Sequence, residues 1–78
     1  MTEREEQYLA AIEVLKPELH RLLGPEEGTR LNRRLGQYLR RARSSQHRER
    51  ALTHALDAIA EHPPARSAWR RSWAGRRG

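Results

Sequence analysis

Apolar residues recur every three or four positions along this chain, and this helical period limits its fold more than any other feature. An α-helix turns about once in 3.6 residues, so residues at this spacing lie on one face. The three stripes consist of Tyr8, Ile12, Leu15, Leu19 and Leu22, then Leu31, Leu35, Tyr38 and Ala42, and then Leu52, Ala55, Leu56 and Ile59. No segment alternates as a β-strand would. The sequence therefore predicts an all-α protein.

Pairs of helix-breaking or capping residues separate the stripes. Gly24-Pro25, Ser44-Ser45 and Pro63-Pro64 stand where helices are expected to end, and we expect the two serines also to cap the helix that follows. Thr2 begins a T-x-x-E capping box, which is typical of a helix start. The apolar positions of the first stripe stay in phase across Pro17. We therefore expect one kinked helix there rather than two.

Short connections between the stripes place consecutive helices antiparallel. We expect an antiparallel three-helix bundle with a short C-terminal fourth helix, which carries Ala65, Trp69 and Trp73 on one face. We expect Trp69 in the core, whereas Trp73 is either a core residue or a half-exposed anchor for a partner. A single helical domain then covers residues 1–75, and residues 76–78 form a disordered tail.

The core that these helices can form is small. The chain has 78 residues, 36% of them are apolar, and ten of the apolar residues are alanines. Chains of this length commonly gain stability from disulfides, a metal or a partner. Cysteine is absent, so disulfides contribute nothing. We therefore expect a partner to add stability.

Targeting and membrane-spanning signals are missing from the sequence. The N-terminus lacks the apolar region of a signal peptide, and no apolar run approaches the ~18 residues of a transmembrane helix. The absence of cysteine agrees with a reducing compartment. We therefore expect a cytoplasmic protein with no membrane partner.

Catalytic and metal-binding patterns are also missing. His47 and His54 share a helix face, but no third ligand accompanies them at the close spacing that zinc sites use. No serine stands in a strand–turn–helix elbow, and the chain has no glycine-rich phosphate loop. We therefore expect no enzymatic activity, no catalytic or metal-binding residue and no cofactor.

Charge divides the chain into an acidic and a basic part. Residues 1–28 have a net charge of −4, residues 29–78 have a net charge of +10, and fifteen of the sixteen basic residues are arginines. On the second helix, Arg33 and Arg40 point away from the apolar stripe, with Gly36 and Arg43 beside them. A second ridge on the flank of this helix consists of Arg30, Arg34 and Arg41.

The glycine between these arginines permits two interpretations. An exposed glycine in mid-helix costs about 1 kcal/mol relative to alanine. Gly36 therefore either forms a shallow notch that lets a backbone or an acidic group approach, or results from neutral drift at a solvated position. The planar donor fork of arginine suits carboxylate and phosphate groups. The candidate partner-binding residues are Arg30, Arg33, Arg34, Gly36, Arg40, Arg41 and Trp73.

The C-terminal third of the chain resembles a known group of adaptor domains. The segment LTHALDAIAEHP, residues 52–63, is followed by Ala68-Trp69-Arg70-Arg71, so a helix, a proline turn and a tryptophan helix succeed one another. This order resembles the end of the small helical effector-associated and death-like domains of bacterial conflict systems. The resemblance implies homotypic association that gathers effectors, with no catalytic residue in the domain itself.

Two functions follow from these features. The first is a non-catalytic protein–protein interaction or adaptor module. It binds an acidic protein surface, or self-associates as a homo-oligomer through its acidic first helix and arginine-rich second helix. The alternative is a small basic nucleic-acid-binding protein, because the net charge is +6. We favour the first, because no helix-turn-helix pattern is convincing and the acidic first helix would have to face away from phosphate.

Overall fold

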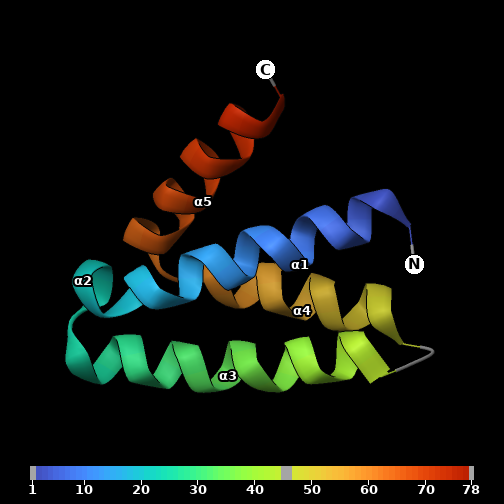
Figure 1. Cartoon of the computed structure of the whole chain (residues 1–78). Coiled ribbons are helices and arrows are strands. Elements are labelled where there is room, and N and C mark those ends of the chain that lie inside the picture. The colour runs from blue at the N-terminus through green and yellow to red at the C-terminus, as the bar shows by residue number, and fades with distance from the viewer. Residues whose placement is uncertain (1, 45–46, 78) are drawn as a thin grey trace.

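The fold consists of helices, with no strand among residues 2–44 and 47–77, which the computed structural model describes. The predicted all-α class is confirmed. Along the chain in Figure 1, the elements are α1 (Glu3–Leu15), the 3-10 helix η1 (Lys16–Glu18), α2 (Leu19–Leu23), α3 (Pro25–Ser44), α4 (Arg48–Ala60) and α5 (Pro63–Arg77).

The first helix begins as predicted but does not pass through Pro17 as one kinked helix. The Thr2 hydroxyl accepts a hydrogen bond from the Glu5 N–H, and the Glu5 carboxylate accepts one from the Thr2 N–H, so the capping box is present. Three residues around Pro17 form η1, which separates α1 from α2. Proline has no N–H to donate, and the backbone tightens into a 3-10 turn in which the Leu19 N–H bonds the Lys16 carbonyl. The expectation of one continuous helix is therefore wrong.

The turns lie near their predicted positions, but two details differ. Gly24 has a φ of 89°, a region that glycine adopts at little cost, and Pro25 begins α3 directly after it. The N-cap of α4 is His47 rather than a serine, and Ser45 lies outside the described residues. α5 also continues to Arg77, into the segment where the sequence placed the tail.

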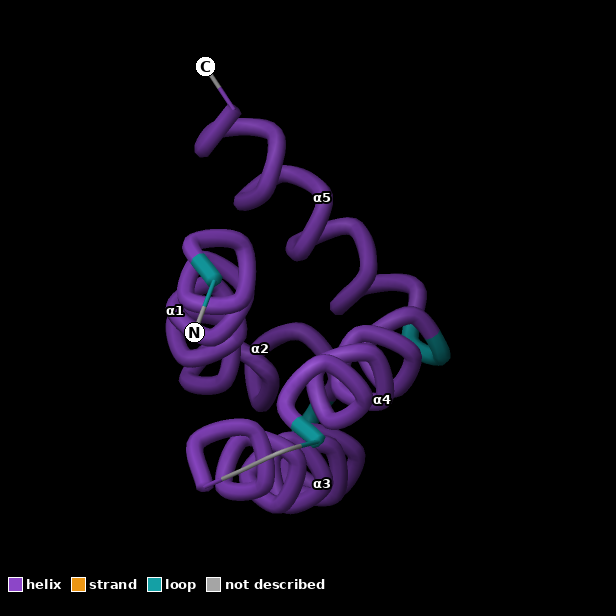
Figure 2. The backbone as a smooth tube through the Cα atoms, turned by 90° about the vertical axis from the view of Figure 1, so that its right-hand side faces the viewer, coloured by secondary structure: helices purple, strands orange, loops and turns teal. Residues whose placement is uncertain are grey.

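α3 and α5 lie on opposite sides of the molecule. In Figure 1, α3 and α4 lie side by side and run in opposite directions. α1 lies beside α4, above α3 in the view of Figure 2. Figure 2 shows α1, α3 and α4 nearly end-on, and α5 is inclined to them on the side away from α3. α5 contacts α1, α2 and α4. The outer face of α3 is therefore turned away from all the other helices.

The apolar stripes meet in one core, although five predicted core residues are only partly buried: Tyr8, Leu22, Tyr38, Leu56 and Trp69. The largest side chains that are almost fully buried are Ile12, Leu19, Leu31, Leu35, Leu39 and Ile59. Leu56 lines a groove between α1 and α4 and is half-buried. Trp69 packs against the edge of the core rather than inside it.

α2 packs directly against the start of α3 at Gly28. A Cβ atom on Gly28 would lie 2.7 Å from His20 Cδ2 and 2.8 Å from the Leu19 carbonyl oxygen, closer than such atoms approach. Beside this contact, the Thr29 hydroxyl and His20 Nε2 form a hydrogen bond of 3.0 Å. Because glycine has no side chain, the two helices can meet here. The contact holds η1, which precedes α2, beside the next turns of α3.

Candidate functional site

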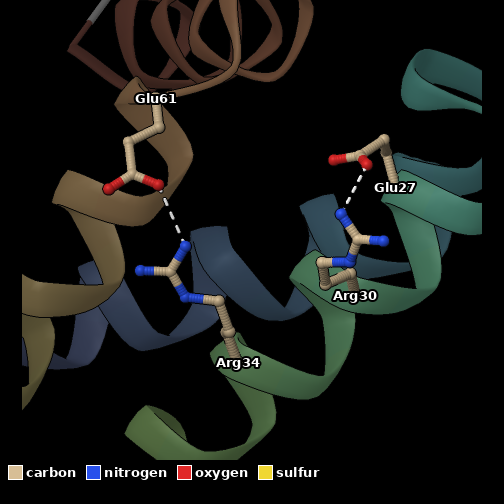
Figure 3. A network of polar contacts seen from close by, with 4 residues as sticks. All are labelled: Glu27, Arg30, Arg34 and Glu61. Carbon is tan, nitrogen blue, oxygen red and sulfur yellow. Dashed lines mark hydrogen bonds and ion pairs between the residues drawn. The ribbon is translucent and has the colours of Figure 1, made fainter.

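α3 carries six arginines, and the structure gives acidic partners to two of the predicted site residues. Arg30 pairs with Glu27 of the same helix at 2.7 Å (Figure 3). Arg34 pairs at 2.9 Å with Glu61, which directly follows α4. Hydrogen bonds to Glu61 and to Tyr38 raise the pKa of Arg34 above its ordinary value. Arg30 and Arg34 are therefore already engaged inside the chain.

Arg43 and Arg48 connect α1 to the other helices. Arg43 pairs with Glu13 of α1, so this arginine, which the helical period places beside Arg33 and Arg40, is already engaged inside the chain. Arg48 donates from Nε to a carbonyl oxygen near the end of α3 at 2.7 Å, and its Nη1 lies 3.9 Å from a carboxylate oxygen of α1. These two arginines hold helices together. Arg43 is the third arginine of α3 with a partner, after Arg30 and Arg34.

The remaining three, Arg33, Arg40 and Arg41, form the outer arginine face of α3. All three side chains are exposed. None of them forms an ion pair or a side-chain hydrogen bond with any side chain that the structure describes. Arg33 and Arg40 point away from the core, as their spacing from the apolar stripe predicted. Their donor forks are available to a group outside the chain.

Gly36 is half-buried, so the prediction of an open, solvated glycine is wrong. Arg40 Nη1 lies 3.6 Å and Lys16 Nζ lies 3.7 Å from the position that a Cβ atom on Gly36 would take. Lys16 comes from η1, and the pattern of α3 alone gives no sign of it. The one signal in the sequence is that Lys16 is the chain's single lysine and directly precedes Pro17.

A shallow groove extends from Lys16 along α3. It encloses about 530 Å³ and contains polar, apolar and cationic side chains. Its lining residues are Lys16, Pro17, Thr29, Asn32 and Arg33. Because Lys16 Nζ and Arg40 Nη1 both lie near Gly36, the groove adjoins the outer arginine face. η1 and α3 thus form one continuous cationic surface.

Trp73 belongs to a separate aromatic cluster on the other side of the molecule. Its ring centroid lies 4.8 Å from that of Tyr8 and 5.7 Å from that of Trp69, and the two indoles are stacked at 7°. Trp73 is half-buried. Tyr8 also borders a groove of about 440 Å³ between α1 and α4. Because α5 and α3 lie on opposite sides (Figures 1 and 2), the structure does not bring Trp73 together with the arginines of α3.

Metal sites and membrane-spanning helices are absent from the part of the chain that the structure describes. Within residues 2–44 and 47–77, no group of three or more His, Cys, Asp or Glu side chains is arranged to hold a metal ion. The same part of the chain contains no helix long and apolar enough to cross a membrane. Comparisons of this chain with protein-family models, with curated proteins and with solved structures found no match. The cationic surface of η1 and α3 is therefore the basis for a functional proposal.

Proposed function

We propose that this protein is a non-catalytic helical interaction module that binds an acidic protein surface through the outer arginine face of α3. The observation that carries the proposal is the division among the six arginines of this helix. Three close ion pairs within the chain, and Arg33, Arg40 and Arg41 are exposed without an acidic partner among the described side chains. Exposed arginines add little to stability. They bind carboxylates strongly, because the fork makes two parallel hydrogen bonds.

A second copy of the chain offers one such acidic surface. Glu3 and Glu6, at the start of α1, are exposed and have no basic partner among the described side chains. The acidic residues and the outer arginine face lie on different helices, so these unlike surfaces can join copies head to tail. We propose that the chain forms homo-oligomers in this way. The antiparallel three-helix bundle with a C-terminal fourth helix is the arrangement that we propose for each copy.

The resemblance of the C-terminal third to effector-associated and death-like domains agrees with a cytoplasmic adaptor role. Such domains gather effectors by associating with one another and carry no catalytic residue. Trp73 adds a second, apolar contact on the opposite side of the molecule, because half-buried tryptophans are frequent binding anchors. One copy would then contact a neighbour through α3 and another through α5.

Nucleic-acid binding is the alternative function, and the arginines of α5 favour it. Arg66, Arg70 and Arg71 are exposed and have no acidic partner among the described side chains. They lie on the opposite side of the molecule from the outer arginine face. The two sets of arginines do not join into the basic stripe that follows a phosphate backbone. An acidic protein partner therefore accounts better for the surface of α3.

Light scattering and fluorescence anisotropy on the whole chain separate the two functions. The probes are the chain itself, a labelled poly-glutamate peptide and a short DNA duplex, each over a salt series. The interaction module predicts self-association or peptide binding, both weakened by salt. A nucleic-acid-binding protein predicts a duplex complex whose log affinity falls linearly with log salt. Duplex binding alone, or no binding to any probe, would overturn the proposal.

A further inference from the structure

We propose that Lys16 and Arg40 form an anion-binding notch over Gly36 that takes one carboxylate of an acidic protein partner. This inference rests on the proposed function and deepens it, because it names the ligand group and adds a residue from outside α3. The two side chains come from different elements, yet their nitrogens lie 3.7 and 3.6 Å from one point beside the Gly36 backbone. The term Lys16–Arg40 notch is used for these two side chains and Gly36.

The acidic residues near the Lys16–Arg40 notch are already engaged. Glu13, one helical turn before Lys16, pairs with Arg43, and Glu18 pairs with Arg21. Neither Lys16 nor Arg40 has an acidic partner among the described side chains. Two like charges that converge without an acid between them repel, and a bound anion replaces this repulsion with two attractions. The notch therefore carries positive charge that a bound anion would neutralise.

Gly36 gives the anion access to the helix. A side chain at this position would begin between the two nitrogens, 3.6 and 3.7 Å from them. Because glycine has none, an oxygen atom can approach the backbone there and accept hydrogen bonds from both sides. Charge-assisted bonds of this kind have lengths of about 2.7–2.9 Å, so the flexible ends of Lys16 and Arg40 need only small movements to close on it.

The surroundings of the notch favour a single carboxylate over the phosphates of a nucleic acid. On the α1 side, the glutamates of the two neighbouring ion pairs flank Lys16. A nucleic-acid strand carries phosphates in series and would bring further negative charges against these glutamates. One carboxylate between Lys16 and Arg40 avoids them. The adjoining groove, with Pro17, Thr29 and Asn32 in its wall beside Lys16 and Arg33, then offers a path without negative charge for the partner's chain.

An NMR titration of the whole chain tests the notch. The probes are a short peptide with one glutamate among uncharged residues and, separately, inorganic phosphate, and the signals followed are the backbone amides of Lys16 and Gly36. Both signals should shift and saturate with the peptide. Lys16→Gln should weaken peptide binding about tenfold, the loss of one charge-assisted contact. Arg66→Gln removes the same charge from α5 and should leave the affinity unchanged, and Gly36→Leu should abolish binding by filling the notch.

The outcomes distinguish the notch from the broader proposal. If Lys16→Gln binds like the parent while Arg33→Glu/Arg40→Glu does not bind, the notch is wrong and the outer arginine face stands. If neither variant loses affinity, both proposals are wrong. Tighter binding of phosphate than of the peptide would overturn the assignment to a carboxylate and favour a nucleic-acid ligand.

Discussion

The start and the middle of α3 each contain a glycine, and the two glycines have different surroundings. At Gly28, the backbone of α2 is so close that a Cβ atom would lie 2.8 Å from a carbonyl oxygen. At Gly36, the nearest atoms are the ends of two flexible side chains at ordinary contact distance. The first glycine permits two helices to pack, and the second leaves space beneath two cations. The same residue type therefore serves helix packing at one position and leaves room for the proposed partner group at the other.

The arginines of α3 divide in the same way. Arg34 and Arg43 reach α4 and α1 and close ion pairs there, whereas Arg33 and Arg40 find no acid among the described side chains. Neighbours contributed by other helices, rather than the arginines themselves, decide this division. α3 thus has an inner surface that holds the fold and an outer surface available for binding.

Alanine substitution at the two glycines tests the comparison with the largest expected effect. Gly28→Ala should lower the free energy of unfolding by about 1–3 kcal/mol, because the new Cβ forces α2 away from α3. Gly36→Ala should instead raise it by up to about 1 kcal/mol, because alanine is the better helix former and its Cβ meets no backbone. Urea unfolding followed by circular dichroism measures both. Shifts of the same sign would break the comparison.

Smaller effects are expected from the ion pair between Arg34 and Glu61. These side chains remain 42% and 58% exposed, so solvent weakens their attraction. A double-mutant cycle with Arg34→Ala and Glu61→Ala should give a coupling energy of about 0.2–1 kcal/mol that decreases with salt. The matched cycle with Arg33→Ala and Glu61→Ala should give none. Equal coupling in the two cycles would mean that the paired and unpaired arginines do not differ.

The sequence predicted the features of this fold that depend on local order. The capping box at Thr2 and the turn at Gly24-Pro25 need only neighbouring residues, and both are present. The predicted stripe of α3 is buried at Leu31, Leu35 and Ala42, whereas Tyr38 is only partly buried. The break at Pro17 was predicted only as a kink. The apolar positions stay in phase across Pro17, and this pattern does not distinguish a kinked α-helix from a short 3-10 turn. The extension of α5 to Arg77 was missed because the terminal glycines suggested a tail.

Only part of the candidate site could be predicted from the sequence. The helical period places Arg33 and Arg40 opposite the core, and both are exposed. The ion pairs of Arg34 and Arg43 join residues 27 and 30 positions apart, so they depend on how the helices pack. Lys16 reaches Gly36 only because η1 passes beside α3. Contacts between elements decided which predicted residues have partners, and sequence periodicity carries no information on such contacts.

The affinity of two charge-matched variants for a labelled poly-glutamate peptide tests the central claim most directly. Arg33→Glu/Arg40→Glu reverses the outer arginine face, and Arg66→Glu/Arg71→Glu makes the same change of net charge on α5. All four arginines are exposed, so the free energy of unfolding of both variants should stay within about 0.5 kcal/mol of the parent's. We predict that the α3 variant loses at least about tenfold in affinity while the α5 variant stays within about threefold of the parent. Equal losses would show that the peptide responds to net charge alone, and would contradict the assignment of α3 as the binding surface.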